Sequence, residues 1–178
     1  ILLNTYLITN MQLSHNDNRF TSKKHPIVIV CDNINNAPNL GSILRLADAF
    51  NVQEVRFCGE NIPIGKRMQK TSRSSEKYVV FSNPDSALNE MQKFKNSNYK
   101  IIALEITNNS HPISKISLNS NQSVVLILGD ENYGISEEIL LISDVITHID
   151  MFGNNSCMNV ASAAAIALYE ITKQQNNQ

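Results

Sequence analysis

The residues best suited to chemistry lie in two loops, each of which follows a short apolar run. The run 124–128 ends in Gly129-Asp130-Glu131-Asn132-Tyr133-Gly134, and the run 145–149 ends in a polar stretch that reaches Asn159. Short apolar runs of this kind predict buried parallel strands, and open α/β sheets hold their ligands at the carboxyl ends of such strands. We therefore expect the two loops to form one pocket.

A third group of polar residues follows the first apolar run, 27–31. Apolar residues then recur at helical spacing, which predicts a helix over 39–50 that packs on the sheet, with Asn39 as its N-cap. Gly41 in the first turn costs about 1 kcal/mol relative to alanine, which indicates a close approach of another backbone. Arg45 lies one turn further on, and by itself it is typical of a surface arginine.

The rest of the chain alternates between strand and helix patterns. Strands that alternate with helices predict the α/β class, with a mostly parallel sheet flanked by helices. We divide the chain into a short polar lead-in (1–26), a single domain (27–174) and a polar tail (175–178). Beyond the runs already named, we expect strands at 54–58, 78–81 and 100–104, a polar connection at 111–122, and helices at 86–95, 136–142 and 160–173.

Composition limits the class of protein. A chain of 178 residues can form one domain with a substantial core, and no apolar run approaches the ~18 residues that span a bilayer. The amino end lacks a signal-peptide pattern. The 3 cysteines lack metal-ligand spacing, and we interpret Cys31 and Cys58 as buried free thiols. We therefore expect a cytoplasmic protein with no metal and no membrane segment.

One cluster of cations contrasts with the nearly neutral net charge of −1. If this segment is helical, four of its cations are spaced 4, 3 and 4 residues apart and share one face, which could follow the phosphates of a nucleic acid. A solvated surface explains such a cluster about as well. The cluster consists of Lys66, Arg67, Lys70, Arg73 and Lys77, countered only by Glu76.

Three motifs occur in order along the chain. They are Asn39-x-Gly41-x-x-x-Arg45 after the first strand, Leu128-Gly129-x-Glu131-x-x-Gly134 after a later strand, and Met158-Asn159-Val160 at the start of the last helix. Together they closely resemble the three motifs of the SpoU (TrmH-type) branch of the SPOUT RNA methyltransferases, over roughly residues 27–174. Ala103-Leu104-Glu105, at the end of a strand, is also similar to a run in that family.

The resemblance implies a fold, a partner and a reaction. The fold is a SPOUT-type α/β sheet whose carboxyl-terminal part forms a deep trefoil knot, and the protein is a homodimer. The reaction transfers a methyl group from S-adenosylmethionine to a ribose 2′-hydroxyl of tRNA or rRNA, with the cationic cluster as our candidate for holding the RNA. The resemblance implies catalytic roles for Arg45, Asn39, Glu131 and Asn159, and a cofactor pocket formed by Leu104, Glu105, Gly129, Ile149, Met151, Cys157 and Met158.

The role of Arg45 stays open at this stage. The family proposal makes this arginine a general base, but a guanidinium keeps its proton to above about pH 12. Arg45 could instead stabilise the forming alkoxide or orient the adjacent phosphate, positioned by Asn39 and acting across the dimer interface. Two residues depart from the family pattern, because Cys157 replaces the usual serine and Asp150 replaces the usual proline.

Two other interpretations remain. One is a doubly wound nucleotide-binding domain with a different cofactor, although the sequence has no G-x-G-x-x-G or Walker A pattern. The other is a non-catalytic RNA-binding protein that kept the knotted fold and lost turnover. Methyl incorporation into RNA separates this last interpretation from the enzyme.

Overall fold

The computed structural model describes residues 17, 20–155 and 157–176, so most of the predicted lead-in lies outside the described residues. Within them, one sheet has the strand order β3-β2-β1-β6-β4-β7-β5, and each neighbouring pair is parallel. The predicted α/β class is confirmed. The strands are β1 (His25–Asp32), β2 (Val52–Cys58), β3 (Phe81–Ser82), β4 (Lys100–Leu104), β5 (His111–Pro112), β6 (Val124–Gly129) and β7 (Val145–His148).

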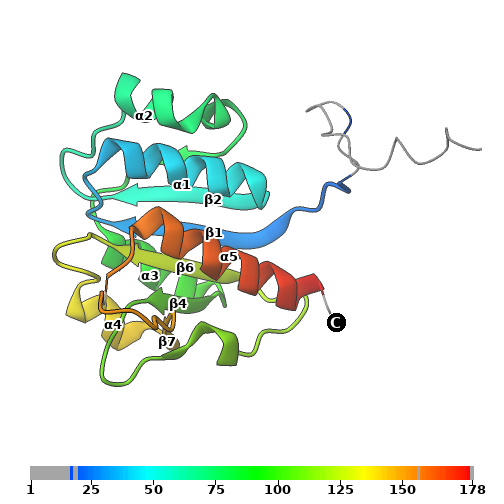
Figure 1. Ribbon diagram of the computed structural model, residues 1–178, viewed down its shortest axis with the longest axis vertical. Coiled ribbons are helices and arrows are strands. Elements are labelled where there is room, and N and C mark those ends of the chain that lie inside the picture. Colours follow the sequence, from blue (N-terminus) through cyan, green and yellow to red (C-terminus); the bar gives the residue numbers. More distant parts are fainter. Residues whose placement is uncertain (1–16, 18–19, 156, 177–178) are drawn as a thin grey trace, which may run out of the picture.

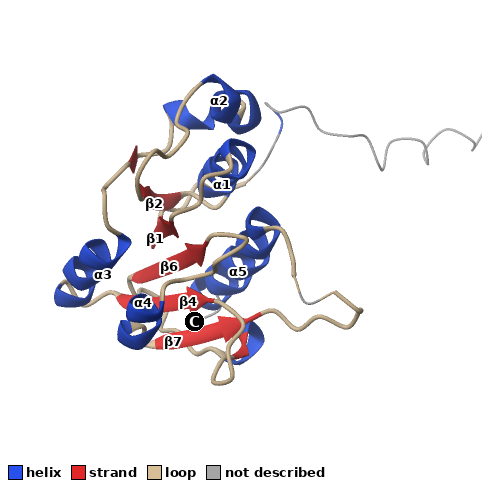
Figure 2. Cartoon of the chain, turned by 90° about the vertical axis from the view of Figure 1, so that its left-hand side faces the viewer, coloured by secondary structure: helices blue, strands red, loops and turns tan. Residues whose placement is uncertain are grey.

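Helices cover both faces of this sheet (Figures 1 and 2). Helices α1 and α5 pack on one face, and α3 and α4 pack on the other. Among the described helices, none combines the length and hydropathy of a membrane span. The helices are α1 (Ala37–Ala49), α2 (Lys66–Ser72), α3 (Ala87–Asn96), α4 (Glu137–Ile142) and α5 (Val160–Asn176), with 3-10 turns η2 (Ser75–Lys77) and η3 (Ile113–Lys115).

The central strands are buried on both faces. In β1, Ile27 and Ile29 belong to the core beneath α1 and α5, whereas Val28 and Val30 belong to the core beneath α3 and α4. Successive residues of a strand point to opposite faces, so a strand covered on both sides must be apolar throughout. This requirement explains why β1 and β6 are such clear apolar runs in the sequence.

The prediction that Asn39 caps α1 is wrong. The helix begins at Ala37, and the cap is Asn36, whose side chain accepts a hydrogen bond from the Asn39 N–H at 3.2 Å. Pro38 fits the first turn, because an N–H there would have no partner within the helix. The Asn39 side chain is consequently available for other contacts.

The close backbone approach predicted at Gly41 is confirmed. Helix α2 crosses α1 at this position, and a Cβ on Gly41 would lie 2.4 Å from the carbonyl oxygen of Met68. No side chain larger than hydrogen fits there without moving the two helices apart. The crossing places the cationic cluster directly against α1.

The cationic cluster is not one helix, so the condition on which its four cations would share one face is not met. Helix α2 ends at Ser72, and Arg73 and Ser74 both adopt left-handed backbone conformations, with φ of 49° and 74°. Lys77 then falls in the separate turn η2. The chain therefore changes direction between the cations on α2 and those that follow.

The strand predicted at 78–81 exists, but its bounds are wrong, because it begins only at Phe81. Only Phe81–Ser82 pairs with β2, and η2 occupies the residues just before Tyr78. Tyr78 and Val80 are exposed, while Val79 and Phe81 pack against the core. The apolar run in the sequence thus reflects a segment at the edge of the sheet whose side chains alternate in burial, and most of it is not a paired strand.

Two segments that the sequence predicts to be irregular, 111–122 and the residues after 173, contain regular structure. The polar connection 111–122 contains the short strand β5 and the turn η3. Helix α5 continues past the expected end at 173, because the Gln175 side chain is buried and bonds to His25 at 3.0 Å and to the Gln122 carbonyl at 2.9 Å. Polar residues near a helix end are in this case part of the packed structure.

Candidate active site

A cavity of about 510 Å³ opens at the carboxyl ends of β4, β6 and β7. Its walls are the ends of these strands, the loop after β6, the loop between β7 and α5, and the first turn of α5. The predicted single pocket formed by the two loops is confirmed. Every residue expected in a cofactor pocket lines this cavity, namely Leu104, Glu105, Gly129, Ile149, Met151, Cys157 and Met158.

Two glycines close the loop after β6. Gly134 has a φ of 67°, which side-chain-bearing residues rarely adopt, and a Cβ there would lie 2.5 Å from a carboxylate oxygen of Glu105. A Cβ on Gly129 would lie 2.2 Å from the Gly134 carbonyl carbon. The loop therefore folds back on its own strand, and its backbone forms the cavity wall.

The Glu105 carboxylate fastens this wall. One oxygen accepts a hydrogen bond from the Ile135 N–H at 3.1 Å, and the other accepts one from the Ile106 N–H at 2.9 Å. These bonds join the end of β4 to the loop after β6. Glu105 thus lines the cavity as predicted, but its oxygens are bonded to the backbone.

One residue from each of the three sequence motifs meets in a hydrogen-bond network. Asn39 Nδ2 donates to Glu131 Oε1 at 2.9 Å. Asn159 Nδ2 lies 3.0 Å from Glu131 Oε1 and 3.0 Å from Asn39 Oδ1. Asn159 Oδ1 also accepts the N–H groups of Ala161 and Ser162, at the start of α5. The network joins α1, the loop after β6 and α5.

Arg45 lies outside the cavity of its own chain. It is exposed, does not line the cavity, and lies about 9 Å further along α1 than Asn39 at 1.5 Å per residue. Gly41, Arg45 and Asp48 share one stripe of α1. Gly41 touches α2, and Asp48 accepts a 3.0 Å hydrogen bond from Ser75 in η2. Arg45 is therefore flanked by the cationic segment.

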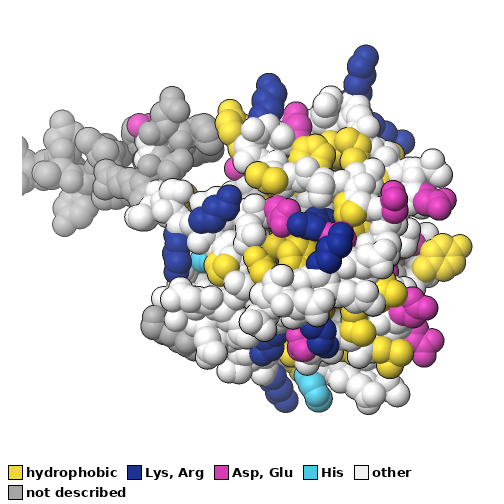
Figure 3. Space-filling view, turned by 180° about the vertical axis from the view of Figure 1, so that it is seen from behind, with side chains coloured by type: hydrophobic (Ala, Val, Ile, Leu, Met, Phe, Trp, Pro, Cys, Tyr) yellow, Lys and Arg dark blue, Asp and Glu magenta, His cyan; other side chains and the backbone are white. Residues whose placement is uncertain are grey.

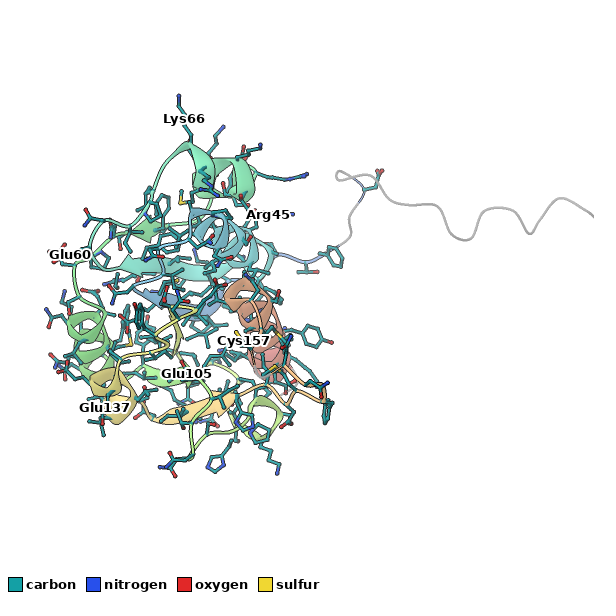
Figure 4. The ribbon with its side chains drawn as sticks, turned by 60° about the vertical axis from the view of Figure 1, so that its left-hand side comes forward. Arg45, Glu60, Lys66, Glu105, Glu137 and Cys157 are labelled. Atoms are coloured by element: carbon teal, nitrogen blue, oxygen red, sulfur yellow. The ribbon has the colours of Figure 1, made fainter. Side chains whose placement is uncertain are left out.

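Figure 4 shows the same separation of parts. Arg45 and Lys66 lie in the upper half of the view, near α1 and α2, whereas Glu105 and Cys157 lie in the lower half, near the cavity. The five predicted RNA-binding cations are all exposed. The structure thus brings three of the four predicted catalytic residues together and leaves Arg45 beside the cations.

Residues 26–169 match the model of the SpoU rRNA Methylase family. The chain belongs to this family. It is 26% identical over 170 residues to the tRNA (guanosine(18)-2'-O)-methyltransferase of Aquifex aeolicus, a match that covers 96% of this chain and 80% of that protein. It is 31% identical over 150 residues to an uncharacterized tRNA/rRNA methyltransferase of Mycobacterium tuberculosis, covering 82% of this chain and 51% of that protein.

Solved structures of SpoU proteins share this fold. The crystal structure of the Aquifex aeolicus TrmH/SpoU tRNA modifying enzyme has a TM-score of 0.77 at 27% identity, and the match covers 84% of this chain and 75% of that one. The AdoMet complex of the SpoU methyltransferase AviRb from Streptomyces viridochromogenes also has a TM-score of 0.77, at 21% identity, over 85% of this chain and 61% of that one. The trefoil knot stays a prediction from the sequence.

His148 is a cavity residue that sequence reasoning on this SpoU chain missed. His148 is the last residue of β7, and its Nδ1 lies 2.8 Å from Ser110 Oγ. Its Nε2 lies 3.5 Å from Asp150 Oδ1. Thr107 and Tyr133 also line the cavity. His148, Thr107 and Tyr133 each lie within a few residues of the end of β4, β6 or β7. Their position at the carboxyl edge of the sheet could have identified them as cavity residues from the sequence.

The cysteines differ in environment. Cys31 and Cys58 are buried and free, as predicted, whereas Cys157 is free and exposed. Burial raises the pKa of Cys58 to about 12, and burial also raises the pKa of Cys31 well above its ordinary value. The part of the chain that the structure describes holds no cluster of His, Cys, Asp or Glu suited to a metal ion.

Proposed function

We propose that this SpoU-family chain transfers a methyl group from S-adenosylmethionine to a ribose 2′-hydroxyl of RNA. The charge of the cavity carries the proposal. Glu105, Asp130 and Glu131 line it, and its described lining residues include no lysine or arginine. Such a cavity favours a ligand with a positive sulfonium and disfavours the phosphates of a nucleotide cofactor such as NAD. The charge therefore argues against a doubly wound domain with another nucleotide cofactor.

The residues present fit S-adenosylmethionine. The cavity has the size of a typical small-molecule site, about 300–1,000 Å³, and its walls combine apolar side chains with carboxylates and other polar groups. Leu104, Ile149, Met151 and Met158 would hold the flat adenine between apolar side chains, and the bare backbone at Gly129 allows close hydrogen bonding. When bound, S-adenosylmethionine supplies an electrophilic methyl group. The chain supplies shape, exclusion of water and alignment.

Asn39, Glu131 and Asn159 act as positioning residues in this proposal. Their network holds the loop after β6 and the start of α5 in a fixed relation to α1. The helix that carries Arg45 is thereby held in place relative to the cavity. A displaced network would therefore misalign the ribose hydroxyl and the methyl group, even with both ligands bound.

Arg45 acts at the cavity of the partner subunit of a homodimer. Its exposure and its absence from the walls of its own cavity support this assignment. A guanidinium does not release its proton near neutral pH, so we assign Arg45 the donation of hydrogen bonds to the forming alkoxide or to the adjacent phosphate. The dimer contact would involve α5, on which Ile166 and Tyr169 are 40% and 63% exposed.

The substrate RNA, which is tRNA or rRNA, binds along the cationic cluster at 66–77, beside Arg45. Five phosphate contacts would give a slope of about −3.5 to −4.5 in a plot of log binding constant against log salt concentration. We also place the enzyme in the cytoplasm, because free thiols suit a reducing compartment. The named activity of the Aquifex aeolicus relative, on guanosine 18 of tRNA, makes tRNA the first substrate to test.

Two measurements test the proposal in sequence. Calorimetry should show saturable binding of S-adenosylmethionine and S-adenosylhomocysteine, near one per chain, and no binding of NAD. Incubation with RNA and labelled S-adenosylmethionine should then yield 2′-O-methylated nucleotides. Binding of RNA without any methyl transfer would favour the non-catalytic protein, and binding of neither adenosyl ligand, with or without RNA, would refute the enzyme.

A further inference from the structure

Two large apolar side chains stand exposed at the edge of the sheet. Tyr78 is 76% exposed and Val80 is 62% exposed, whereas Val79 between them packs against the core. The segment is held firmly, because the Val79 N–H bonds to the Ser75 carbonyl at 3.0 Å and the Val80 carbonyl accepts the Val55 N–H at 2.9 Å. The Tyr78 ring is thus presented to solvent from a fixed backbone.

Two cations are close to Tyr78 in the chain. Lys77 precedes Tyr78 directly, and Arg73 lies on the preceding turn of chain. The one acidic residue of the segment, Glu76, accepts a hydrogen bond from Ser72 that lowers its pKa, so its negative charge offsets just one of the five cations at 66–77. Figure 3 shows Lys and Arg side chains at the top of the molecule, over α2, with hydrophobic side chains beside them.

The segment also lies on the side of the molecule that carries Arg45. Ser75, three residues before Tyr78, bonds to Asp48 of α1, and Asp48 is one turn from Arg45. An RNA strand that reaches Arg45 can therefore pass over η2. Cations that contact phosphates next to an exposed aromatic ring are the combination that binds unpaired nucleotides, whose base faces are free to stack.

We propose that Tyr78 is a stacking platform for an unpaired base of the RNA substrate, with Lys77 and Arg73 on the phosphates beside it. This inference rests on the proposed function and narrows its substrate. A base within a duplex has both faces covered by its neighbours, so the platform selects a loop or an end with unpaired nucleotides. Charge complementarity favours RNA here over an apolar protein surface.

The absence of tryptophan from the chain provides a direct test. Tyr78→Trp introduces a single fluorophore at the platform, and Leu141→Trp introduces one at an equally exposed site on α4, where Leu141 is 78% exposed. Each variant is titrated with an unstructured oligoribonucleotide and with a fully paired RNA duplex of equal phosphate number. We expect saturable quenching only for Tyr78→Trp with the unpaired RNA.

Binding by substituted chains gives a second measurement. Loss of one stacked base weakens RNA binding about 5- to 150-fold, which is the effect expected for Tyr78→Ala, whereas Tyr78→Phe should bind as the natural chain does. Both variants should keep the melting temperature, because the ring is exposed. Equal binding by Tyr78→Ala, or equal quenching by duplex and unpaired RNA, would overturn the inference.

The same experiments separate this inference from the proposed function. If the natural chain binds S-adenosylmethionine and methylates RNA while Tyr78→Trp shows no quenching, only the platform is refuted. If adenosyl ligands fail to bind but unpaired RNA still quenches Tyr78→Trp, only the methyl transfer is refuted. A change of Tyr78→Trp emission with protein concentration in the absence of RNA would assign the surface to a second copy of the chain, and would also refute the platform.

Discussion

Replacement of Asn159 by aspartate tests the network that joins the three motifs. The Asn159 side chain has two functions, since its Oδ1 accepts two N–H groups of α5 and its Nδ2 donates to Glu131 and Asn39. Aspartate has the same shape and keeps the helix cap. It replaces the donor with a second carboxylate oxygen, which faces Glu131 Oε1 across about the present 3.0 Å. The substitution therefore changes the network alone.

The expected cost follows from these contacts. Loss of a hydrogen bond to a charged group costs about 1.5–3 kcal/mol, and the lower end applies because the Asn159 and Glu131 side chains are exposed. Repulsion between carboxylates at this distance adds about 1 kcal/mol when water screens it. We expect Asn159→Asp to lower the free energy of unfolding by about 2–3 kcal/mol at neutral pH. The rate of methyl transfer should fall by more than the loss of folded protein explains, because the network positions the site.

Urea unfolding at neutral and acidic pH, together with calorimetry of S-adenosylmethionine, measures these effects. The deficit of Asn159→Asp relative to the natural chain should shrink at about pH 4, since protonation of the introduced aspartate restores a donor. A second substitution, Glu131→Gln, restores a donor at neutral pH and should recover most of the lost stability. A deficit that is independent of pH and unaffected by Glu131→Gln would refute the assignment of these hydrogen bonds.

Four further outcomes are expected. Arg45→Ala should lower kcat about 10²–10³-fold with unchanged S-adenosylmethionine affinity, and Arg45→Lys should restore little, because a lysine lacks the planar fork; full activity of Arg45→Lys would refute this geometry. Gly134→Ala should cost about 2–3 kcal/mol and weaken S-adenosylmethionine binding, through backbone strain and displacement of the Glu105 carboxylate. A thiol reagent at about pH 8 should modify only Cys157 in the folded chain, since burial raises the pKa values of Cys31 and Cys58. For the same reason, the free energy of unfolding should fall from about pH 9 to about pH 12, because in this range the Cys58 thiol ionises in the unfolded chain alone. Tyr169→Glu should convert the proposed dimer to monomers in sedimentation analysis and abolish methyl transfer, and an active monomer would refute action of Arg45 across the proposed interface.

The sequence by itself determined the buried strands and the residues that meet at the network. Residues 27–31 of β1 and 124–128 of β6 are covered on both faces and are apolar at every position, and such runs are visible without any structure. Asn39, Glu131 and Asn159 were identified because the three motifs that contain them resemble those of the SpoU family. Gly41 was identified through its cost in a helix, which is acceptable only where another backbone comes close.

Tertiary structure decided the details that depend on distant or competing partners. Asn36 and Asn39 are chemically equal candidates for the cap of α1. Asn36 forms the cap, because the Asn39 side chain donates a hydrogen bond to Glu131, 92 positions away. The run at 78–81 is apolar like a buried strand, but the strand that pairs with β2 begins at Phe81. The position of Arg45 beside the cations depends on how α2 crosses α1. These outcomes arise from packing between segments far apart in the chain, which no local pattern records.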